Sequence, residues 1–255
     1  MIHLQGVGRR YPAAGGAGER VALQGVSMHI AAGEFVSLLG PSGCGKSTVL
    51  RLVAGLDDPS EGQVQAPARA PGADGATAFV FQEPTLMPWA TVADNVALPL
   101  RLQGQSRAQV APAVQAVLQR VGLAEVAQAF PAQLSGGMKM RASIARALVT
   151  TPRVLLMDEP FAALDDITRQ RLNTDLLQCW QAQRLAALFV THSVSEAVFL
   201  SQRVLVMAAR PGRVVAEVAI AEPYPRTADF RHSPAFAEHA RVLSQALAEA
   251  SGVQV

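Results

Sequence analysis

This chain of 255 residues has few aromatic residues and little net charge. Aromatic residues make up 5% and charged residues 16% of the sequence, and the formal net charge is +2. A nucleic-acid-binding domain usually carries a marked basic stripe, so this weak bias argues against a nucleic-acid partner. Half of the residues are hydrophobic, which is enough for one sizeable core with a subdomain attached to it.

Long apolar segments are missing as well. No stretch approaches the roughly 18–20 uninterrupted apolar residues that span a bilayer. The N-terminus, MIHLQGVGRRYP, lacks the basic-then-apolar design of a signal peptide. We therefore expect a protein that is made and kept in the cytosol, with any membrane role supplied by a partner.

Cysteine is rare, and the two residues suggest no cross-link. Cys44 and Cys179 form neither a CxxC pair nor any spacing typical of metal ligands. A disulfide is not expected in a reducing compartment. We therefore expect two free thiols.

The hydrophobic pattern predicts an α/β protein with a mostly parallel sheet. Apolar runs at 34–40, 154–158 and 186–192 are continuous rather than alternating, as in parallel strands buried on both faces. Strands at 3–7 and 21–30 predict a small antiparallel sheet. Two Gly-rich segments predict loops, namely Gly15–Gly18 between these first strands and the Pro/Gly/Ala-rich stretch 66–78.

Capping signals predict helices between and after the strands. Ser233 and Pro234 open a last helix at about 233–250. Together the signals indicate one domain over 1–255 with a helical subdomain at about 83–150. Three pairs have the spacing of a capping box: Thr91 with Asp94, Ser106 with Gln109, and Ser193 with Glu196.

Residues 40–47 read GPSGCGKS, which fits the phosphate-binding pattern GxxxxGK[ST] between a buried strand and a helix. Such a loop points backbone N–H groups at phosphate oxygens, and the helix start adds partial positive charge. Lys46 can reach the terminal phosphates, and the Ser47 hydroxyl can ligate Mg²⁺. Only Lys46 and Lys139 are lysines among 22 basic residues, so a compact ammonium at this position is unusual for this chain.

Cys44 lies inside this loop near a helix N-terminus, a setting that can lower the pKa of a thiol. One interpretation is a reactive thiol whose alkylation blocks ATP binding. The other is a position that needs a small residue, where sulfur is incidental.

Polar residues end three of the predicted strands. Asp158 can hold Mg²⁺ through water, and Glu159 can orient or deprotonate an attacking water. Gln82 ends the strand FVFQ, and His192 ends AALFVTH and can donate to a γ-phosphate. Ligands in open α/β sheets gather at one edge, where we expect these side chains to meet. Taken alone, Asp158 and Glu159 also fit an acid pair at the start of a helix. Gln82 also fits a loop residue, and His192 a capping or core histidine.

Residues 134–138 read LSGGM and precede the helical segment MKMRASIARAL. With them the chain resembles the ABC ATPase family, whose signature is LSGGQ, and the resemblance covers nearly the whole chain with its motifs in the family's order. It implies a P-loop NTPase core with a mostly parallel sheet, an N-terminal antiparallel β subdomain and an inserted α-helical subdomain. Its cofactors would be ATP and Mg²⁺.

The resemblance also implies roles for particular residues. Tyr11 would stack on adenine, although it could instead be a strand tyrosine of the small sheet. Gln82 would serve the Q-loop beside the metal, and His192 would be the switch histidine. Asp158 and Glu159 would form Walker B. The remaining nucleotide contacts would come from the Walker A residues Gly40, Pro41, Ser42, Gly43, Cys44, Gly45, Lys46, Ser47 and Thr48, from the signature residues Ser135, Gly136 and Gly137, and from Asp165 of the D-loop.

Head-to-tail homodimerisation is implied too, with each ATP between the Walker A loop of one subunit and the signature of the other. Met138 replaces the glutamine of the signature, and Met140 stands where the family often has another glutamine. Met138 cannot donate a hydrogen bond. The Ser–Gly–Gly anion site remains, so we expect activity to survive.

Three segments resemble the branch of importers of nitrate, sulfonates and taurine: TLMPWATVADNVALPL, MDEPFAALDDITR and MAARPGRVV. Importers of pyrimidine-type vitamin precursors look similar, so the solute stays open. The branch implies an ATPase that energises import, held peripherally at the cytoplasmic face of the inner membrane by an integral membrane permease and served by a separate solute-binding protein. The family places the permease's cytoplasmic helix at residues 86–89, although Trp89 could instead belong to the core.

A non-transport ABC ATPase that acts on the ribosome or DNA is the alternative. Ribosome-associated members usually carry two ATPase units, whereas this chain has one Walker A motif. DNA-repair members insert long coiled coils before the signature, and no sustained heptad repeat is present here. Both observations favour transport.

Overall fold

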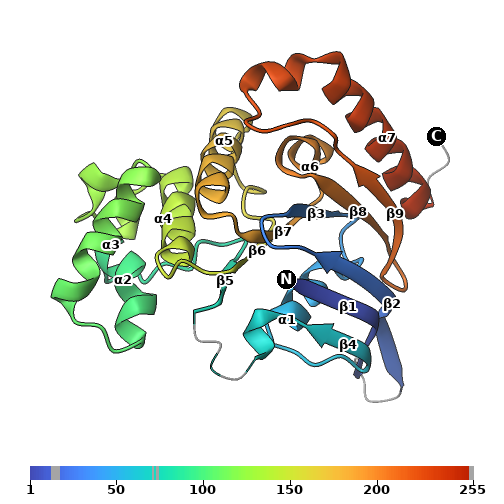
Figure 1. Cartoon of the computed structure of the whole chain (residues 1–255), viewed down its shortest axis with the longest axis horizontal. Coiled ribbons are helices and arrows are strands. Elements are labelled where there is room, and N and C mark those ends of the chain that lie inside the picture. The colour runs from blue at the N-terminus through green and yellow to red at the C-terminus, as the bar shows by residue number, and fades with distance from the viewer. Residues whose placement is uncertain (13–17, 71, 73–74, 253–255) are drawn as a thin grey trace.

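Two β-sheets and seven α-helices make up the described part of the structure (Figure 1). The computed structural model describes residues 1–12, 18–70, 72 and 75–252. Most of the predicted loop Gly15–Gly18, and part of the predicted loop 66–78, lie outside these residues. Within the described residues, no helix has the length and apolarity needed to cross a membrane.

The smaller sheet is antiparallel, as predicted. It contains β1 (Ile2–Pro12), β2 (Glu19–Ile30) and β4 (Glu61–Gln65) in the order β2-β1-β4. Alternate residues at the end of β2 are buried, so one face of this sheet packs on the core and the other faces solvent.

The larger sheet has the order β5-β6-β7-β3-β8-β9. Every neighbouring pair is parallel except β8 and β9, which are antiparallel. This confirms the predicted mostly parallel sheet. Its strands are β5 (Thr77–Val80), β6 (Val154–Asp158), β7 (Ala186–Thr191), β3 (Phe35–Leu39), β8 (Arg203–Ala208) and β9 (Arg213–Ala219).

The central strands are apolar throughout because both faces of the larger sheet are covered. In β3, Phe35 and Leu39 point into a layer that contains α5 (Asp166–Gln183), α6 (Val194–Leu200) and α7 (Pro234–Ser251). Val36 and Leu38 point into a second layer that contains α1 (Lys46–Val53) and the smaller sheet. This alternation between two cores explains the continuous apolar runs in the sequence.

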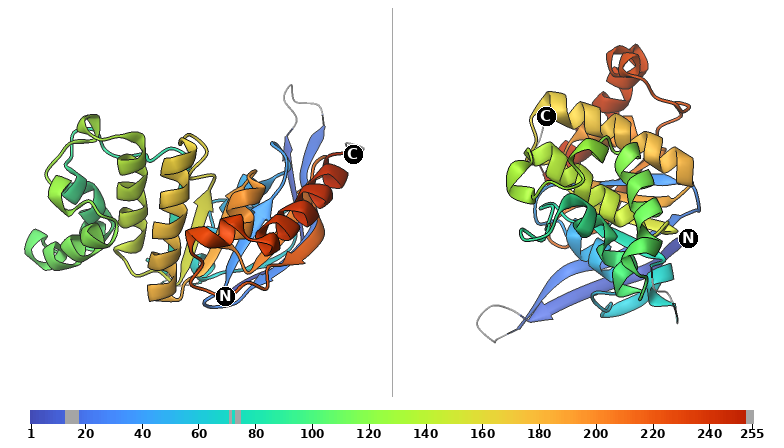
Figure 2. Two further views of the ribbon diagram at one scale, coloured as in Figure 1. Left: turned by 90° about the horizontal axis from the view of Figure 1, so that it is seen from above. Right: turned by 90° about the vertical axis from the view of Figure 1, so that its left-hand side faces the viewer.

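Three helices gather at one end of the molecule, beyond α5 (Figures 1 and 2). They are α2 (Val92–Leu102), α3 (Arg107–Arg120) and α4 (Gly136–Leu148). Thr91 caps α2, and Ser106 caps α3 in a complete capping box with Gln109, as predicted. Short 3₁₀ turns at Ala124–Val126 and Pro131–Gln133 join α3 to α4, and two others lie at Pro67–Arg69 and Ala228–His232.

Two of the three predicted capping boxes are wrong. At the start of α2 the Asp94 carboxylate accepts a hydrogen bond from the Thr91 hydroxyl at 2.8 Å instead of from the Thr91 backbone N–H. Ser193 caps α6 and accepts a hydrogen bond from the Glu196 backbone N–H at 3.3 Å. The Glu196 side chain does not return to Ser193, because it accepts a hydrogen bond from the buried Thr191 hydroxyl instead. The Ser193 N–H donates to the same hydroxyl at 3.0 Å, so the box is replaced by a tighter buried arrangement.

The last helix begins as predicted, with Ser233 as its cap and Pro234 in its first turn. Leu243 is buried at its centre, and Phe236, Ala240 and Leu247 pack beside it on the core. The helix thereby packs against β8 and α6.

Candidate nucleotide-binding site

The carboxyl ends of four neighbouring parallel strands supply the candidate site. Gly40 follows β3, Asp158 ends β6 and His192 follows β7. β5 ends at Val80, two residues earlier than predicted, so Gln82 lies in the turn after it. Because these strands are parallel and adjacent, all four positions lie at one edge of the sheet.

The loop after β3 is shaped by a glycine at its tightest point. Gly45 has φ = 96° and precedes the first residue of α1. A Cβ at this position would lie 2.5 Å from Leu23 Cδ2 of the smaller sheet, so a side chain has no room. The left-handed conformation and the close approach both require glycine here.

Lys46 is held inside this loop, with 5% of its surface exposed. Its Nζ donates hydrogen bonds to the carbonyl oxygens of Gly40 at 2.8 Å and Pro41 at 3.1 Å. It also lies 3.5 Å from Glu159 Oε1. The Lys46 ammonium is thus held between the loop carbonyls and Glu159, at a position where it would contact the phosphates of a bound nucleotide.

Two side-chain oxygens meet next to Lys46 in the sequence of the loop. Ser47 Oγ and Asp158 Oδ1 are 3.1 Å apart. Burial raises the pKa of the Asp158 carboxyl, the hydrogen bond from Ser47 opposes this, and the nearby charge of Glu159 adds to it. A partly buried carboxylate paired with a hydroxyl is a donor set that suits Mg²⁺, which prefers a few protein oxygens together with phosphate.

Glu159 is turned into the site by an unusual backbone conformation. Its φ is 43°, in the left-handed region that non-glycine residues rarely adopt. Its N–H donates to the carbonyl of Val190 at 3.0 Å, which holds the turn in place. As a result Oε2 lies 3.0 Å from His192 Nδ1, while Oε1 faces Lys46. Such strain often marks a functional position.

A cavity of about 490 Å³ lies at this edge of the sheet, with Lys46, Ser47, Asp158 and Glu159 among its lining residues. The predicted residues Gly40, Pro41 and Cys44 do not line it, and His192 reaches it through Glu159. Four lining residues were not predicted from the sequence: Arg20, Val21, Ala22 and Arg210. The predicted residues that line it are Tyr11, Ser42, Gly43, Gly45, Lys46, Ser47, Thr48, Gln82, Asp158 and Glu159.

Tyr11 is oriented by two residues that the sequence analysis missed. Its hydroxyl donates to Asp57 Oδ2 at 2.6 Å. The guanidinium of Arg9 lies over the Tyr11 ring, 4.6 Å from its centroid, and pairs with the same carboxylate. Asp57 is 46 positions away in the chain, so no local pattern reveals this contact.

The reactive-thiol interpretation of Cys44 is contradicted. Its side chain is fully buried behind the loop. Burial raises the pKa of the thiol, and this outweighs the opposing effects of Lys46 and of the backbone N–H groups. A small side chain is what the position requires.

The signature residues form a second group away from the cavity. Ser135 caps α4 and accepts from the Met138 N–H at 3.3 Å, and Asp165 caps α5. A Cβ at Gly137 would lie 2.8 Å from Thr168 Cγ2, so the signature packs on the first turn of α5. Neither Ser135 nor Asp165 lines the cavity, and both are exposed.

Comparison with known proteins identifies the family. The ABC transporter family matches residues 23–162 of the sequence. This chain belongs to the ABC transporter family. One relative is the nitrate import ATP-binding protein NrtD of Synechocystis sp. (strain ATCC 27184 / PCC 6803 / Kazusa), which is 44% identical over 90% of this chain and 89% of the relative. Another is the aliphatic sulfonates import ATP-binding protein SsuB 2 of Burkholderia cenocepacia, which is 45% identical over 89% of this chain and 82% of the relative.

A solved ABC structure is also similar. The dimeric post-hydrolysis state of the ATP-binding cassette MJ0796, bound to ADP and Pi, aligns with a TM-score of 0.76 and 31% identity, covering 88% of this chain and all of that one. A putative ATP-binding protein of Brucella abortus is 47% identical over 85% of this chain and 84% of its own length. The P-loop NTPase fold predicted from the sequence is thereby confirmed.

Thiol labelling tests the corrected view of Cys44. In the folded chain we expect a thiol reagent to titrate well under one group per chain, because both cysteines are buried and burial raises the pKa of each. In denaturant it should titrate both. Cys44→Ser and Cys179→Ser variants assign any residual signal. Rapid labelling of Cys44 in the folded chain, located by peptide mass spectrometry, would restore the reactive interpretation.

Proposed function

We propose that this chain is the ATP-hydrolysing subunit of an ABC importer for a small solute. The observation that carries the proposal is the convergence of Lys46, Ser47, Asp158 and Glu159 on one cavity at the edge of the sheet. The NrtD and SsuB names assign nitrate and aliphatic sulfonate import to proteins that share about 45% of their residues with this chain. The solute of this chain belongs to that class or to the vitamin precursors.

ATP lies along the cavity with its phosphates in the loop 40–47. The loop N–H groups and Lys46 neutralise the β- and γ-phosphate oxygens. Adenine stacks on the ring of Tyr11, whose orientation is set by Asp57 and Arg9. Ser42 and Thr48 also line the cavity that would hold ATP.

Mg²⁺ fits the oxygen donors beside the phosphates. Ser47 and Asp158 would hold it, Asp158 through water, and Gln82 lines the same cavity. When bound, the cation neutralises charge on the β- and γ-phosphate oxygens.

Hydrolysis depends on the position of Glu159. Its carboxylate is placed to accept the proton of the attacking water as a general base. His192 fixes one carboxylate oxygen by a 3.0 Å contact, and Lys46 attracts the other. These two contacts thereby hold Glu159 in position to activate a water molecule beside the γ-phosphate.

A second copy of the chain completes the site. Ser135 and Gly136 present the exposed N-terminus of α4, whose free N–H groups form an anion site that the cavity of the same chain does not use. A head-to-tail homodimer brings these groups, with Asp165, to the γ-phosphate bound by the partner. The dimeric state of the MJ0796 cassette supports this arrangement.

Glu159→Gln separates binding from hydrolysis. Glutamine keeps the shape of the side chain but removes the base and one negative charge beside the γ-phosphate. We expect the hydrolysis rate to fall by about 10²–10⁴ while Mg-ATP still binds. Gel filtration should then show a dimer with ATP and not with ADP.

Lys46→Ala is the matched variant, because it weakens nucleotide binding and should stay monomeric under the same conditions. If Glu159→Gln hydrolyses ATP at the parent rate, Glu159 is not the catalytic carboxylate.

The permease docks beside the end of β5 on the helical region. Trp89 is 76% exposed, which rules out the alternative of a core residue. The buried side chain of Asn95 holds the segment before α2: its Oδ1 accepts from the Met87 N–H at 2.7 Å, and its Nδ2 lies within 3.1 Å of three carbonyl oxygens. A rigid loop therefore presents an aromatic side chain to a partner.

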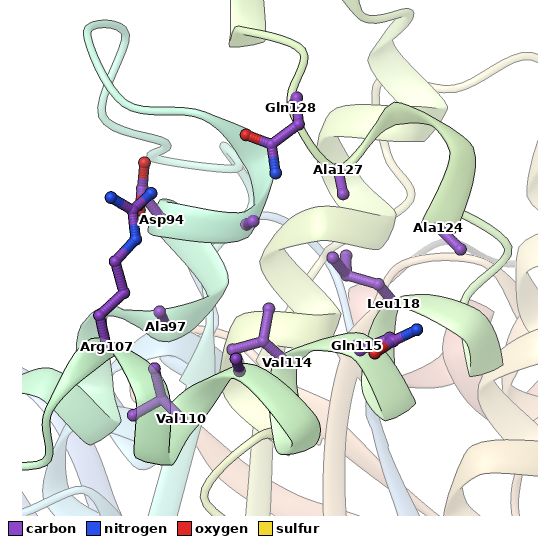
Figure 3. Close-up of a pocket in the computed structure, with 12 residues that line it drawn as sticks. Asp94, Ala97, Arg107, Val110, Val114, Gln115, Leu118, Ala124, Ala127 and Gln128 are labelled. Atoms are coloured by element: carbon purple, nitrogen blue, oxygen red, sulfur yellow. The ribbon is translucent and has the colours of Figure 1, made fainter.

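A groove on the same helical region adds a second candidate contact surface. Figure 3 shows it between α2, α3 and the segment 124–128, with Asp94 and Arg107 at one end and Val110, Val114 and Leu118 along its floor. Its volume is about 350 Å³. An amphipathic cytoplasmic helix of the permease fits such an apolar groove with a charged rim.

Trp89→Ala tests this coupling surface. We expect transport in the reconstituted complex to fall severely, while ATPase activity and melting temperature of the isolated chain stay at parent values because the side chain is exposed. Leu102→Ala is the matched control, since Leu102 is 78% exposed at the far end of α2. A Trp89→Ala variant that transports normally would move the docking surface elsewhere.

The whole chain, 1–255, acts as one ABC ATPase domain with its helical subdomain at about 83–150. It works peripherally at the cytoplasmic face of the inner membrane, held there by the integral membrane permease. A separate solute-binding protein delivers the solute to that permease.

A further inference from the structure

A buried carboxylate lies directly behind the candidate catalytic residues and has no part in the functions above. Glu196 stands in the first turn of α6 and is 5% exposed. It does not line the nucleotide cavity. A buried carboxylate loses the solvation of water and persists only where hydrogen bonds or opposite charges compensate for that loss. Its partners therefore indicate what it does.

The first partner fixes the backbone around His192. Thr191, which is itself buried, donates its hydroxyl hydrogen bond to Glu196 Oε2. The same hydroxyl accepts from the Ser193 N–H at 3.0 Å. The residues on both sides of His192 are thus tied to one hydroxyl group, and that group is oriented by Glu196.

The second partner comes from α5. Arg169 Nε lies 4.0 Å from Glu196 Oε1, and Arg169 Nη2 lies 2.8 Å from Asp166 Oδ1 in the first turn of that helix. Arg231 adds a second cation, whose charge interacts with that of Glu196. Its guanidinium lies over the Phe199 ring at 3.6 Å and donates to Ser195 Oγ at 3.4 Å. The carboxylate therefore lies among cations from outside its own helix.

These contacts form a continuous path between two parts of the site. It starts at the turn capped by Asp165, passes through Arg169 and Glu196 to Thr191, and ends at His192 and Glu159. The Asp165 turn packs on the signature and is exposed, whereas His192 touches the catalytic candidate. Glu196 joins the two halves of this path, because it contacts both Arg169 and Thr191.

We propose that Glu196 is a positioning residue for ATP hydrolysis, which holds His192 against Glu159 and links it to the first turn of α5. This inference rests on the proposed function of the site. Glu196 does not line the nucleotide cavity, so it acts through His192. Misplacing a catalytic group by about 1 Å can cost roughly 10²-fold in rate.

Glu196→Gln removes the charge but keeps the size and an oxygen that can accept from Thr191. We expect kcat for ATP hydrolysis by the full chain to fall on the order of ten- to hundred-fold. KM for ATP should stay at the parent value, because Tyr11, Lys46, Ser47 and Asp158 are untouched. Glu238→Gln is the matched control, since its ion pair with Arg241 lies on the exposed face of α7, and it should keep the parent kcat.

Arg169→Gln removes the contact between Arg169 and Glu196 from the other side. The Arg169 side chain is 28% exposed, so this variant tests the link even if Glu196→Gln is unstable. It should lower kcat by a similar factor at unchanged KM. The double variant Arg169→Gln/Glu196→Gln should be no slower than either single variant, because one broken link already separates α5 from His192.

The His192→Ala background distinguishes positioning from a general structural role. Single-turnover hydrolysis with excess protein measures the residual rates. If Glu196 acts through His192, adding Glu196→Gln to His192→Ala changes nothing further. Equal losses in both backgrounds would show a structural role and overturn the proposal, as would a Glu196→Gln variant with parent kcat. A parent chain that binds ATP without hydrolysing it would instead refute the proposed function.

Discussion

Parallel pairing of β5, β6, β7 and β3 is the constraint on which the nucleotide site depends. It brings Gln82, Asp158, His192 and the loop after β3 to one edge, although they come from positions spread over more than a hundred residues. The pairing survives because both faces of the sheet are buried, one under α1 and the smaller sheet and the other under α5, α6 and α7. The same apolar side chains that stabilise the fold therefore also set the distances between the polar ones.

Sequence patterns predicted the parts of the structure that depend on contacts between residues close in the chain. The GPSGCGKS loop, the caps at Thr91, Ser106 and Ser233, and the continuous apolar strands each depend on residues close in sequence. Most of the predicted strands and helices appear with shifts of one or two residues, as at β5, whereas β1 runs five residues past its predicted end at 7. The roles given to the individual site residues remain predictions, although most of those residues line one cavity.

Contacts between distant positions account for what the sequence did not reveal. Arg9 and Asp57 orient Tyr11 across the smaller sheet, and Arg210 reaches the cavity from the turn between β8 and β9. Glu196 had the spacing of a capping residue, but the buried Thr191 hydroxyl and Arg169 compete for its carboxylate. Cys44 has the sequence context of a reactive thiol, yet its side chain is buried in the core layer that also contains Met207.

The division of the predicted site into two groups is the central claim, because each copy would hold the phosphates with Lys46 and cover its partner's phosphates with Ser135. Mixing two defective variants tests this directly. Ser135→Asp keeps a good helix cap but repels phosphate, while Lys46→Ala lacks the phosphate ligand. Each variant alone should be inactive, and a mixed dimer should contain one intact site, so a 1:1 mixture should regain ATPase activity. No gain on mixing, or a Ser135→Asp variant with parent activity, would contradict a site shared between two copies.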